Sequence, residues 1–354
     1  MNRIKHLHIL HYTSFTIPFI KLIQDNFNKA EHFFAIYRGK NHNDELKKIE
    51  NSWCGNKLLD LIRLSQLMNG STHIYLHSIN VHKPTQLLFL QPWLLKRTFW
   101  VIWGGDLLAY QNKRQGLYAH LNEYIRRKVI RKLYGIITHT LGDYNTAQKV
   151  YNTRAKYYEC VYYPDAFPHL NLPPKQPEKK NNKQVKKILL GNSASRSNEH
   201  LSLIRRLSAN KVQDFEIFCP LSYGDKQYAK EVIEFGTKLF GDRFHPIVDF
   251  MPIEEYYLFL EQMDIAFFNF GRQQGLGNII TLLYLGKKVY IKTDTALSEL
   301  LKRKNLNFFN IEDFESDFMQ SLSDDSAIEN FESVTTSFSK EKSLTDWQKI
   351  FIGE

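Results

Sequence analysis

The most constraining feature of this sequence is a repeated alternation of short apolar runs with longer amphipathic stretches. In the first half, strands are expected at residues 7–10, 32–37, 73–77, 98–103, 135–138 and 157–162. Helices are expected between them, at 15–27, 56–68, 84–94, 115–134 and 144–151. Strands separated by helices of this length indicate βαβ units, and therefore a parallel sheet.

Residues 168–187, PHLNLPPKQPEKKNNKQVKK, interrupt this alternation. The segment holds four prolines and six lysines and almost nothing apolar, which is typical of a linker; a long surface loop inside one domain is the alternative. Beyond it, strands are expected at 187–191, 215–219, 244–248, 264–270 and 288–292, and helices at 198–209, 226–240, 253–262, 276–285, 297–304 and 344–352. We therefore expect a doubly wound α/β domain at 1–167, a linker at 168–187, and a second such domain at 188–354 that includes the last helix.

The first candidate site follows the strand expected at 187–191. The sequence LLGNSASRSNEH at 189–200 passes from a strand, through small and hydroxylated residues, into a helix. Free backbone N–H groups at a helix start favour anions, and Arg196 adds a positive charge with fork geometry. This pattern predicts a diphosphate site. An ordinary capped turn is the alternative, because serine and asparagine are favoured N-caps.

The second candidate site is GRQQGLGN at 271–278, which again follows an apolar strand and opens a helix. Its glycines let the backbone approach a ligand closely, while Arg272, Gln273 and Gln274 supply hydrogen-bond donors. A glycine-rich turn is weak evidence by itself. Two such turns in one half of the chain, each at the carboxyl end of a strand, favour a shared ligand site.

The candidate general bases lie in the first half. In VIWGGDL at 101–107, Asp106 follows a strand and two glycines, so it is expected at the carboxyl edge of the sheet. A carboxylate there could accept the proton of an attacking hydroxyl; capping of the next segment is the alternative. His77, at the end of another strand, is the second candidate, and His139 and Asp143 are weaker ones.

The stretch NEYIRRKVIRKLY at 122–134 combines a basic and an apolar helix face. Arg126, Arg127 and Arg131 are candidates for contact with anionic lipid headgroups or with an acceptor diphosphate. The alternative is a solvated helix that packs its apolar stripe on the sheet.

Composition excludes several classes of protein. The net charge of +10 attracts phosphate in any form, but no recognition-helix or RNP-type motif is present, so nucleic-acid binding is not expected. Three distant cysteines without a C-x-x-C pair favour neither disulfides nor zinc, and no D-x-D triad ends a strand, so neither a metal nor a cofactor is expected. No secretory signal or 20-residue apolar span is found, which favours a cytoplasmic protein.

At these segments the sequence resembles the bacterial family that transfers 4-acetamido-4,6-dideoxy-galactose (Fuc4NAc) in enterobacterial common antigen synthesis. The similarity rests on WVIWGGDL at 100–107, ILLGNSASRSNEHL at 188–201 and FGRQQGLG at 270–277. Weaker similarity occurs at 141–143, at 163–164, and at Pro220 with Tyr223. The segments follow the same order over nearly the whole chain. The lysine-rich linker departs from the family pattern, and so does Gly105, where alanine is expected.

The resemblance implies a GT-B fold, in which two Rossmann-like domains with parallel sheets face each other across a cleft. It also implies inverting transfer from a dTDP-sugar to an undecaprenyl-diphosphate oligosaccharide, by a peripheral protein on the cytoplasmic face of the inner membrane. The N-terminal domain would then bind the acceptor and the C-terminal domain the nucleotide sugar. Donor contacts are expected from Gly191, Asn192, Ser193, Ser195, Arg196, Asn198, Glu199, Tyr223, Arg272, Gln273, Gln274, Gly275, Gly277 and Asn278. Another deoxyaminosugar, or a UDP donor in capsule or lipopolysaccharide assembly, stays open as an alternative.

Overall fold

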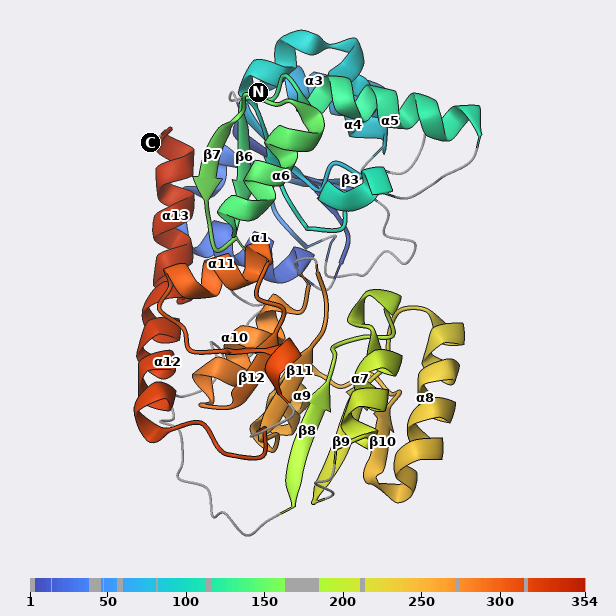
Figure 1. Cartoon of the computed structure of the whole chain (residues 1–354). Coiled ribbons are helices and arrows are strands. Elements are labelled where there is room, and N and C mark those ends of the chain that lie inside the picture. The colour runs from blue at the N-terminus through green and yellow to red at the C-terminus, as the bar shows by residue number, and fades with distance from the viewer. Residues whose placement is uncertain are drawn as a thin grey trace. The chain divides into compact units, whose positions relative to one another are not determined.

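The chain folds into two compact units, each built on its own parallel sheet (Figure 1). The computed structural model describes residues 4–13, 15–37, 46, 48–55, 60–80, 82–111, 116–162, 185–210, 214–271, 274–314 and 318–353. Unit 1 comprises Met1–Asp165 with Ser343–Glu354, and unit 2 comprises Ala166–Lys342. Most of the expected linker, residues 168–184, lies outside the described residues, and its last two lysines begin the first strand of unit 2.

The sheet of unit 1 has the strand order of a doubly wound fold. Within the described residues the order is β3 (Ser52–Gly55), β2 (His32–Tyr37), β1 (Ile4–His11), β4 (Ser71–His77), β5 (Thr98–Val101), β6 (Gly135–Thr138) and β7 (Lys156–Glu159), all parallel. The helices are α1 (Thr16–Asn26), α3 (Asp60–Gly70), α4 (His82–Leu90), α5 (Leu117–Ile130), α6 (Leu141–Tyr151) and α13 (Lys340–Ile352). The strand order reverses direction between β1 and β4, which makes this position the topological switch point.

Unit 2 repeats the same architecture. Its described strands run in the order β10 (Phe244–Ile247), β9 (Phe215–Pro220), β8 (Lys186–Leu190), β11 (Ile265–Phe268), β12 (Lys288–Ile291) and β13 (Phe309–Asn310), again all parallel. Its helices are α7 (His200–Ser208), α8 (Lys226–Phe240), α9 (Ile253–Glu261), α10 (Leu276–Tyr284), α11 (Ala296–Arg303) and α12 (Asp324–Ser337). Here the switch point lies between β8 and β11.

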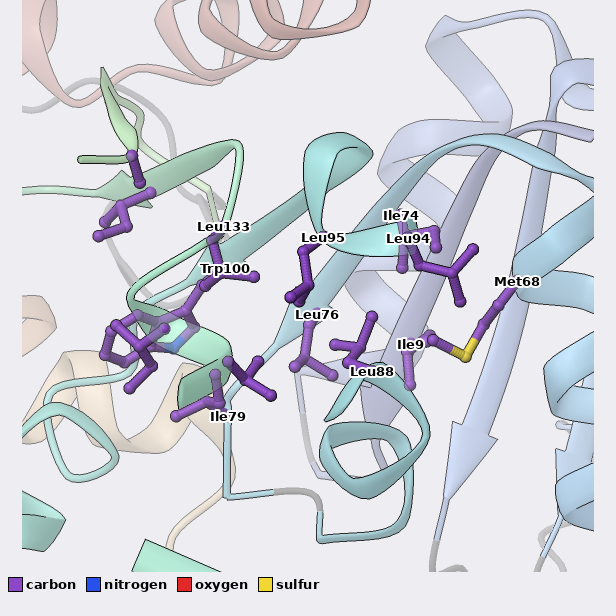
Figure 2. Packing of buried hydrophobic residues seen from close by; sticks show 14 of the residues in the cluster. Ile9, Met68, Ile74, Leu76, Ile79, Leu88, Leu94, Leu95, Trp100 and Leu133 are labelled. Carbon is purple, nitrogen blue, oxygen red and sulfur yellow. The ribbon is translucent and has the colours of Figure 1, made fainter. Parts of the chain in front are cut away.

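The two faces of β1 differ in chemistry because successive side chains of a strand point to opposite faces. Leu7 and Ile9 belong to the apolar core. Figure 2 shows Ile9 in this core with Ile74 and Leu76 of β4 and with Met68 of α3. Burial of these side chains, at roughly 25 cal/mol per Å² of apolar surface, holds α3 and α4 against the sheet.

The opposite face carries a row of histidines, which we call the histidine ladder (His6, His8, His32, His73 and His77); all are buried except His73, which is partly buried. The two ring nitrogens of His8 lie 3.3 Å from Nε2 of His77 and 3.1 Å from Nδ1 of His32. Burial, as the main cause, lowers the pKa of His6 to about 2, of His77 to about 3 and of His32 to about 4. The ladder is therefore neutral at pH 7.

Helix α13 covers the histidine ladder, which corrects our assignment of the last helix to the C-terminal domain. The ring of Phe351 lies 4.7 Å from the rings of both His6 and His32. Trp347 is fully buried, with its ring 6.1 Å from that of His77. The C-terminal segment 343–354 consequently belongs to unit 1, because its apolar side chains complete the core of that unit.

Several elements differ from the sequence-based expectation, among them the short strand β13, which was not expected. The helix expected at 84–94 ends at Leu90, because Pro92 begins a separate 3₁₀ helix, η2 (Pro92–Arg97). Strand β3 and helix α12 were not expected; α12 lies in the acidic stretch and buries few side chains, among them Ala327 and Val334. No helix in the described part of the chain is long and apolar enough to cross a membrane.

Candidate functional site

The candidate site of unit 2 lies at its switch point, where open α/β sheets bind ligands. Gly191 follows β8, and its N–H donates to the carbonyl of Phe267 in β11. Its φ is +70°, and a Cβ there would lie 2.5 Å from Nε2 of His200. Only glycine fits this position without strain, because a side chain would collide with the buried imidazole.

Several buried polar atoms at this switch point have no hydrogen-bond partner within the described protein. They are Oδ1 of Asn192, Asn198 and Asn269, and both ring nitrogens of His200. Burial lowers the pKa of His200 to about 4, so its ring is neutral, with one donor and one acceptor. Buried polar groups are nearly always satisfied in proteins, so such a concentration indicates a place where a ligand supplies hydrogen bonds.

Glu199 connects the ends of the neighbouring strands. It adopts a left-handed backbone conformation (φ 51°) just before α7. Its carboxylate accepts a 2.9 Å hydrogen bond from Nδ2 of Asn269, and both its oxygens lie 3.2 Å from Nζ of Lys292. Residues from the carboxyl ends of β8, β11 and β12 therefore meet at one carboxylate.

The structure brings the two predicted turns together. Oγ of Ser197 donates to Oε1 of Gln274 at 2.9 Å, which joins the turn at 191–199 to that at 269–275. Gly275, at φ +62°, lies against the side chain of Asn192. Within the first turn, Asn198 donates to the carbonyl and Oγ of Ser193, and Oγ of Ser195 lies 2.8 Å from Oγ of Ser197.

Two further hydrogen bonds bring tyrosines into the same cluster. Nδ2 of Asn192 donates to the hydroxyl of Tyr223 at 3.2 Å, and Nδ2 of Asn278 donates to that of Tyr256 at 2.9 Å. Gly277 lies in the first turn of α10. Arg272 and Gln273 lie outside the described residues, so the convergence of Arg272 with Arg196 stays a prediction.

Arg196 has carboxylate partners inside the protein. Its guanidinium donates to both carboxylate oxygens of Glu231 in α8, at 3.1 and 2.8 Å, and lies 3.7 Å from Asp225. It also lies over the ring of Tyr228. In this arrangement Arg196 ties the first turn to α8, and its charge is neutralised. Its contact with a donor diphosphate stays a prediction.

Asp106 does not fit the role of general base. It is 2% exposed, and its two oxygens accept hydrogen bonds from Nε1 of Trp100 and from the backbone N–H groups of Ile79, Trp103 and Leu107, at 2.7 to 3.1 Å. Burial raises its pKa, while these hydrogen bonds act in the opposite direction. Because the carboxylate of Asp106 satisfies these backbone N–H groups, Asp106 stabilises the turn after β5. This is the capping role that the sequence left open as the alternative.

The remaining candidate bases are buried as well. His77 is 1% exposed and belongs to the histidine ladder, so it does not fit the role of a base that reaches substrate. His139 stacks on the ring of Tyr162 at 4.0 Å, and burial lowers its pKa to about 4. Burial raises the pKa of Asp143 to about 6. Of the histidines at the carboxyl ends of β1 and β4, His11 is half-buried rather than enclosed, and sequence reasoning missed it.

The three arginines of α5 divide into different roles. Arg126 is buried: it pairs with Glu123 at 2.6 Å and donates to the carbonyl of Asp106 at 2.7 Å, so it is a structural residue and not a headgroup contact. Arg127 is exposed but pairs with Glu123 at 2.8 Å. Arg131 is exposed at the end of the helix.

A family model for 4-α-L-fucosyltransferases, glycosyl transferase group 56, matches residues 26–352. The chain belongs to this family. It is therefore a glycosyltransferase, and its two Rossmann-like units with parallel sheets form a fold of the GT-B type.

Solved structures support the fold of this group 56 glycosyltransferase. A glycosyltransferase from Rickettsia africae ESF-5 is similar over 100% of this chain and 99% of its own, with a TM-score of 0.71 and 14% identity. Alr3699/HepE from Anabaena, in complex with UDP, is similar over 99% and 100% of the two chains, with a TM-score of 0.69 and 11% identity. MnaA from S. aureus, also with UDP, gives a TM-score of 0.57 at 13% identity, over 99% of this chain and 97% of its own.

The described residues of this glycosyltransferase contain no group of three or more His, Cys, Asp or Glu side chains placed to hold a metal ion. Among the residues that the sequence predicted, Gly191, Asn192, Asn198, Glu199 and Gly275 lie in this cluster, and their contact with a donor stays a prediction. The sequence did not indicate Asn269, His200 or Lys292, although Asn269 and Lys292 stand at the ends of expected strands, the signal used for Asp106.

Proposed function

We propose that this glycosyltransferase transfers a deoxyaminosugar of the Fuc4NAc type from a dTDP-sugar to an undecaprenyl-diphosphate-linked oligosaccharide, with inversion, during surface polysaccharide synthesis. The donor binds in unit 2. The observation that carries this assignment is the cluster of unpartnered buried polar atoms at the switch point of β8 and β11. The quoted resemblance to the Fuc4NAc transferase family supports the choice of sugar, nucleotide and acceptor.

The residues around this cluster suit a nucleotide diphosphate. Lys292 supplies a positive charge, held 3.2 Å from Glu199, and Gly275 brings the backbone to the start of α10. A cation and oriented N–H groups stabilise the negative charge that develops on a leaving phosphate. Arg272 would add a second cation. Protein groups, rather than a metal or a cofactor, perform this task in the proposed mechanism.

We assign the general base to His11, at the switch point of unit 1. The carboxyl end of β1 is the position equivalent to Gly191 in unit 2, because both strands are central in the order of their sheets. An imidazole there accepts the proton of the acceptor hydroxyl as the new C–O bond forms, and the nucleotide diphosphate leaves from the opposite face of the sugar carbon. Direct displacement of this kind inverts the anomeric centre.

A thermal-shift series with dTDP, UDP and GDP tests the donor assignment. At one hundred times its dissociation constant, a bound nucleotide stabilises the native state by about 2.7 kcal/mol. We expect dTDP to raise Tm most. A larger shift with UDP would contradict the dTDP assignment and favour a UDP-sugar transferase, whereas no shift with any nucleotide would contradict the site.

Release of dTDP from dTDP-Fuc4NAc tests the acceptor. We expect release to require a polyprenyl-diphosphate oligosaccharide and to be slow with water alone. Equal rates with and without this acceptor would contradict the proposed transfer. Since the lipid part of such an acceptor lies in a bilayer, the enzyme is proposed to work as a peripheral protein at the cytoplasmic face of the inner membrane.

A further inference from the structure

Unit 1 exposes an unusual number of large apolar side chains on α4, η2 and α5. Leu117 is 90% exposed, Leu90 69% and Trp93 59%. Tyr118, Leu121 and Tyr124 are each more than half exposed as well. Single exposed apolar residues are ordinary on protein surfaces, but a continuous set of them marks a binding surface.

Four exposed residues of α5 and the C-cap residue Arg131 form one stripe. Leu117, Leu121, Tyr124, Lys128 and Arg131 follow one another at spacings of four and three, so they lie on the same face of the helix. The buried residues, which include Ile125, Val129 and Ile130, lie on the opposite face. The exposed stripe is therefore apolar in its first two turns and basic in its last.

Contacts join this stripe to the neighbouring elements. The ring of Phe89, in α4, lies 6.2 Å from that of Tyr124. Nε1 of Trp93 donates to Oδ1 of Asn69 in α3, which fixes the position of the indole beside α4. Figure 1 shows α3, α4 and α5 gathered in one part of unit 1. We call the set Phe89, Leu90, Trp93, Leu117, Tyr118, Leu121 and Tyr124 the α4–α5 surface.

Positive charge borders the α4–α5 surface. Lys96, Lys128, Arg131 and Lys132 are exposed, and Nζ of Lys128 lies 5.3 Å from the ring centroid of Tyr124. The sequence from 83 to 134 contains ten lysines and arginines but only two carboxylates, Asp106 and Glu123. Asp106 is buried and Glu123 pairs with two arginines, so the field near this surface is positive.

We infer that the α4–α5 surface docks on a lipid bilayer that contains anionic headgroups. Leucine and tryptophan side chains enter the interface between headgroups and acyl chains, while lysine and arginine contact the phosphates. The inference rests on the proposed function in one respect: a lipid-linked acceptor would be presented at such a membrane.

Co-sedimentation with vesicles tests the inference without any donor or acceptor. We expect the full chain to bind phosphatidylglycerol-containing vesicles and to bind pure phosphatidylcholine vesicles much more weakly. The double variant Leu117→Asp with Leu121→Asp should lower partitioning at least tenfold. The matched control is Leu258→Asp with Val248→Asp, two exposed apolar residues of unit 2, and we expect a change of less than twofold. Circular dichroism and thermal unfolding verify that both variants fold.

Replacement of basic residues distinguishes electrostatic binding to anionic lipid from nonspecific binding to vesicles. Lys128→Glu with Arg131→Glu should lower partitioning onto anionic vesicles but change the residual binding to phosphatidylcholine little, and added salt should have the same effect. The inference is overturned if the wild type ignores anionic vesicles, or if the Leu117/Leu121 variant binds like the control. It is also overturned if analytical ultracentrifugation shows that this surface joins two copies of the chain and vesicles are not bound.

The same proteins distinguish failure of this surface from failure of the proposed function. A dTDP-induced rise in Tm is measured without lipid, so it reports only on unit 2. Nucleotide binding without vesicle binding would overturn the bilayer surface alone. Vesicle binding without any nucleotide response would support the surface and overturn the proposed donor site.

Discussion

The ammonium group of Lys292 lies 3.2 Å from both carboxylate oxygens of Glu199, at the carboxyl edge of the unit 2 sheet. The same carboxylate accepts a hydrogen bond from Asn269, whose Oδ1 has no partner in the described protein. The charge of Lys292 is paired with Glu199 and partly exposed, so an anionic ligand at the unsatisfied polar atoms would share this ammonium group with Glu199.

Replacement of Lys292 should affect the donor much more than the fold. We expect Lys292→Met to lower kcat/KM for the nucleotide sugar at least tenfold, because a cation near the leaving diphosphate is lost. Its ion pair with Glu199 is partly exposed, so we expect the free energy of unfolding to change by only about 1 kcal/mol. Steady-state kinetics and urea unfolding measure the two quantities. Lys302→Met, an exposed lysine of α11, is the control, and equal kinetics for both variants would rule out a role for Lys292.

Replacement of Asp106 should act through stability. In Asp106→Asn an NH₂ group replaces one oxygen of a carboxylate that four N–H donors surround, so at least one buried donor loses its acceptor. We expect the free energy of unfolding to fall by about 2 kcal/mol, with kcat of the folded fraction within threefold of wild type. Asp249→Asn, at an exposed carboxylate, should change neither. A hundredfold lower kcat at unchanged stability would restore Asp106 as the base.

Replacement of His11 should act through the chemical step. We expect His11→Gln to lower kcat by about 10² to 10⁴, the range typical for loss of a general base. The rise in Tm with dTDP should persist, because the donor binds in unit 2. Single-turnover kinetics and thermal shift measure these effects, and His245→Gln in unit 2 provides the comparison. A wild-type rate for His11→Gln would remove the base assignment.

The sequence predicted the two parallel sheets because every expected strand is an apolar run between helices, but it did not predict the short strands β3 and β13 or helix α12. It was insufficient for the base, because both Asp106 and His77 stand at strand ends but point into the interior of unit 1. The position of a residue at the end of a strand predicts that it lies at the edge of the sheet, but it does not predict the direction in which its side chain points. Helix α13 illustrates a second limit: its apolar residues Trp347 and Phe351 identify a helix, but the histidine face that they cover lies more than 250 residues earlier.

Substitution of two glycines distinguishes a position at which a side chain would collide, Gly191, from one with open space, Gly105. A Cβ at Gly191 would meet Nε2 of His200 at 2.5 Å, and φ is +70°, whereas a Cβ at Gly105 meets nothing within 4 Å. We expect Gly191→Ala to cost about 1–2 kcal/mol from the left-handed backbone alone and to weaken dTDP binding as His200 is displaced. Gly105→Ala should leave both quantities unchanged. Thermal unfolding with and without dTDP measures this difference, and identical behaviour of the two variants would contradict the assigned geometry.

The histidine ladder should make unit 1 sensitive to acid. The pKa of His6, His77 and His32 is lowered in the folded protein to about 2, 3 and 4, below the value of about 6.5 expected in the unfolded chain. Below pH 6.5 the unfolded chain therefore binds protons that the native state does not. The contribution of the neutral histidines to the free energy of unfolding is complete above pH 6.5 and is lost as the pH falls. For each pH unit by which the solution is acidified below about 6.5, each histidine lowers the free energy of unfolding by up to about 1.4 kcal/mol. Urea unfolding between pH 7.5 and 5 measures the slope. The other titrating groups are common to the wild type and His6→Phe. We therefore expect the variant to take up about one proton fewer on unfolding near pH 5, which makes the slope of the free energy of unfolding against pH correspondingly smaller. An equal slope would show that His6 is not held neutral.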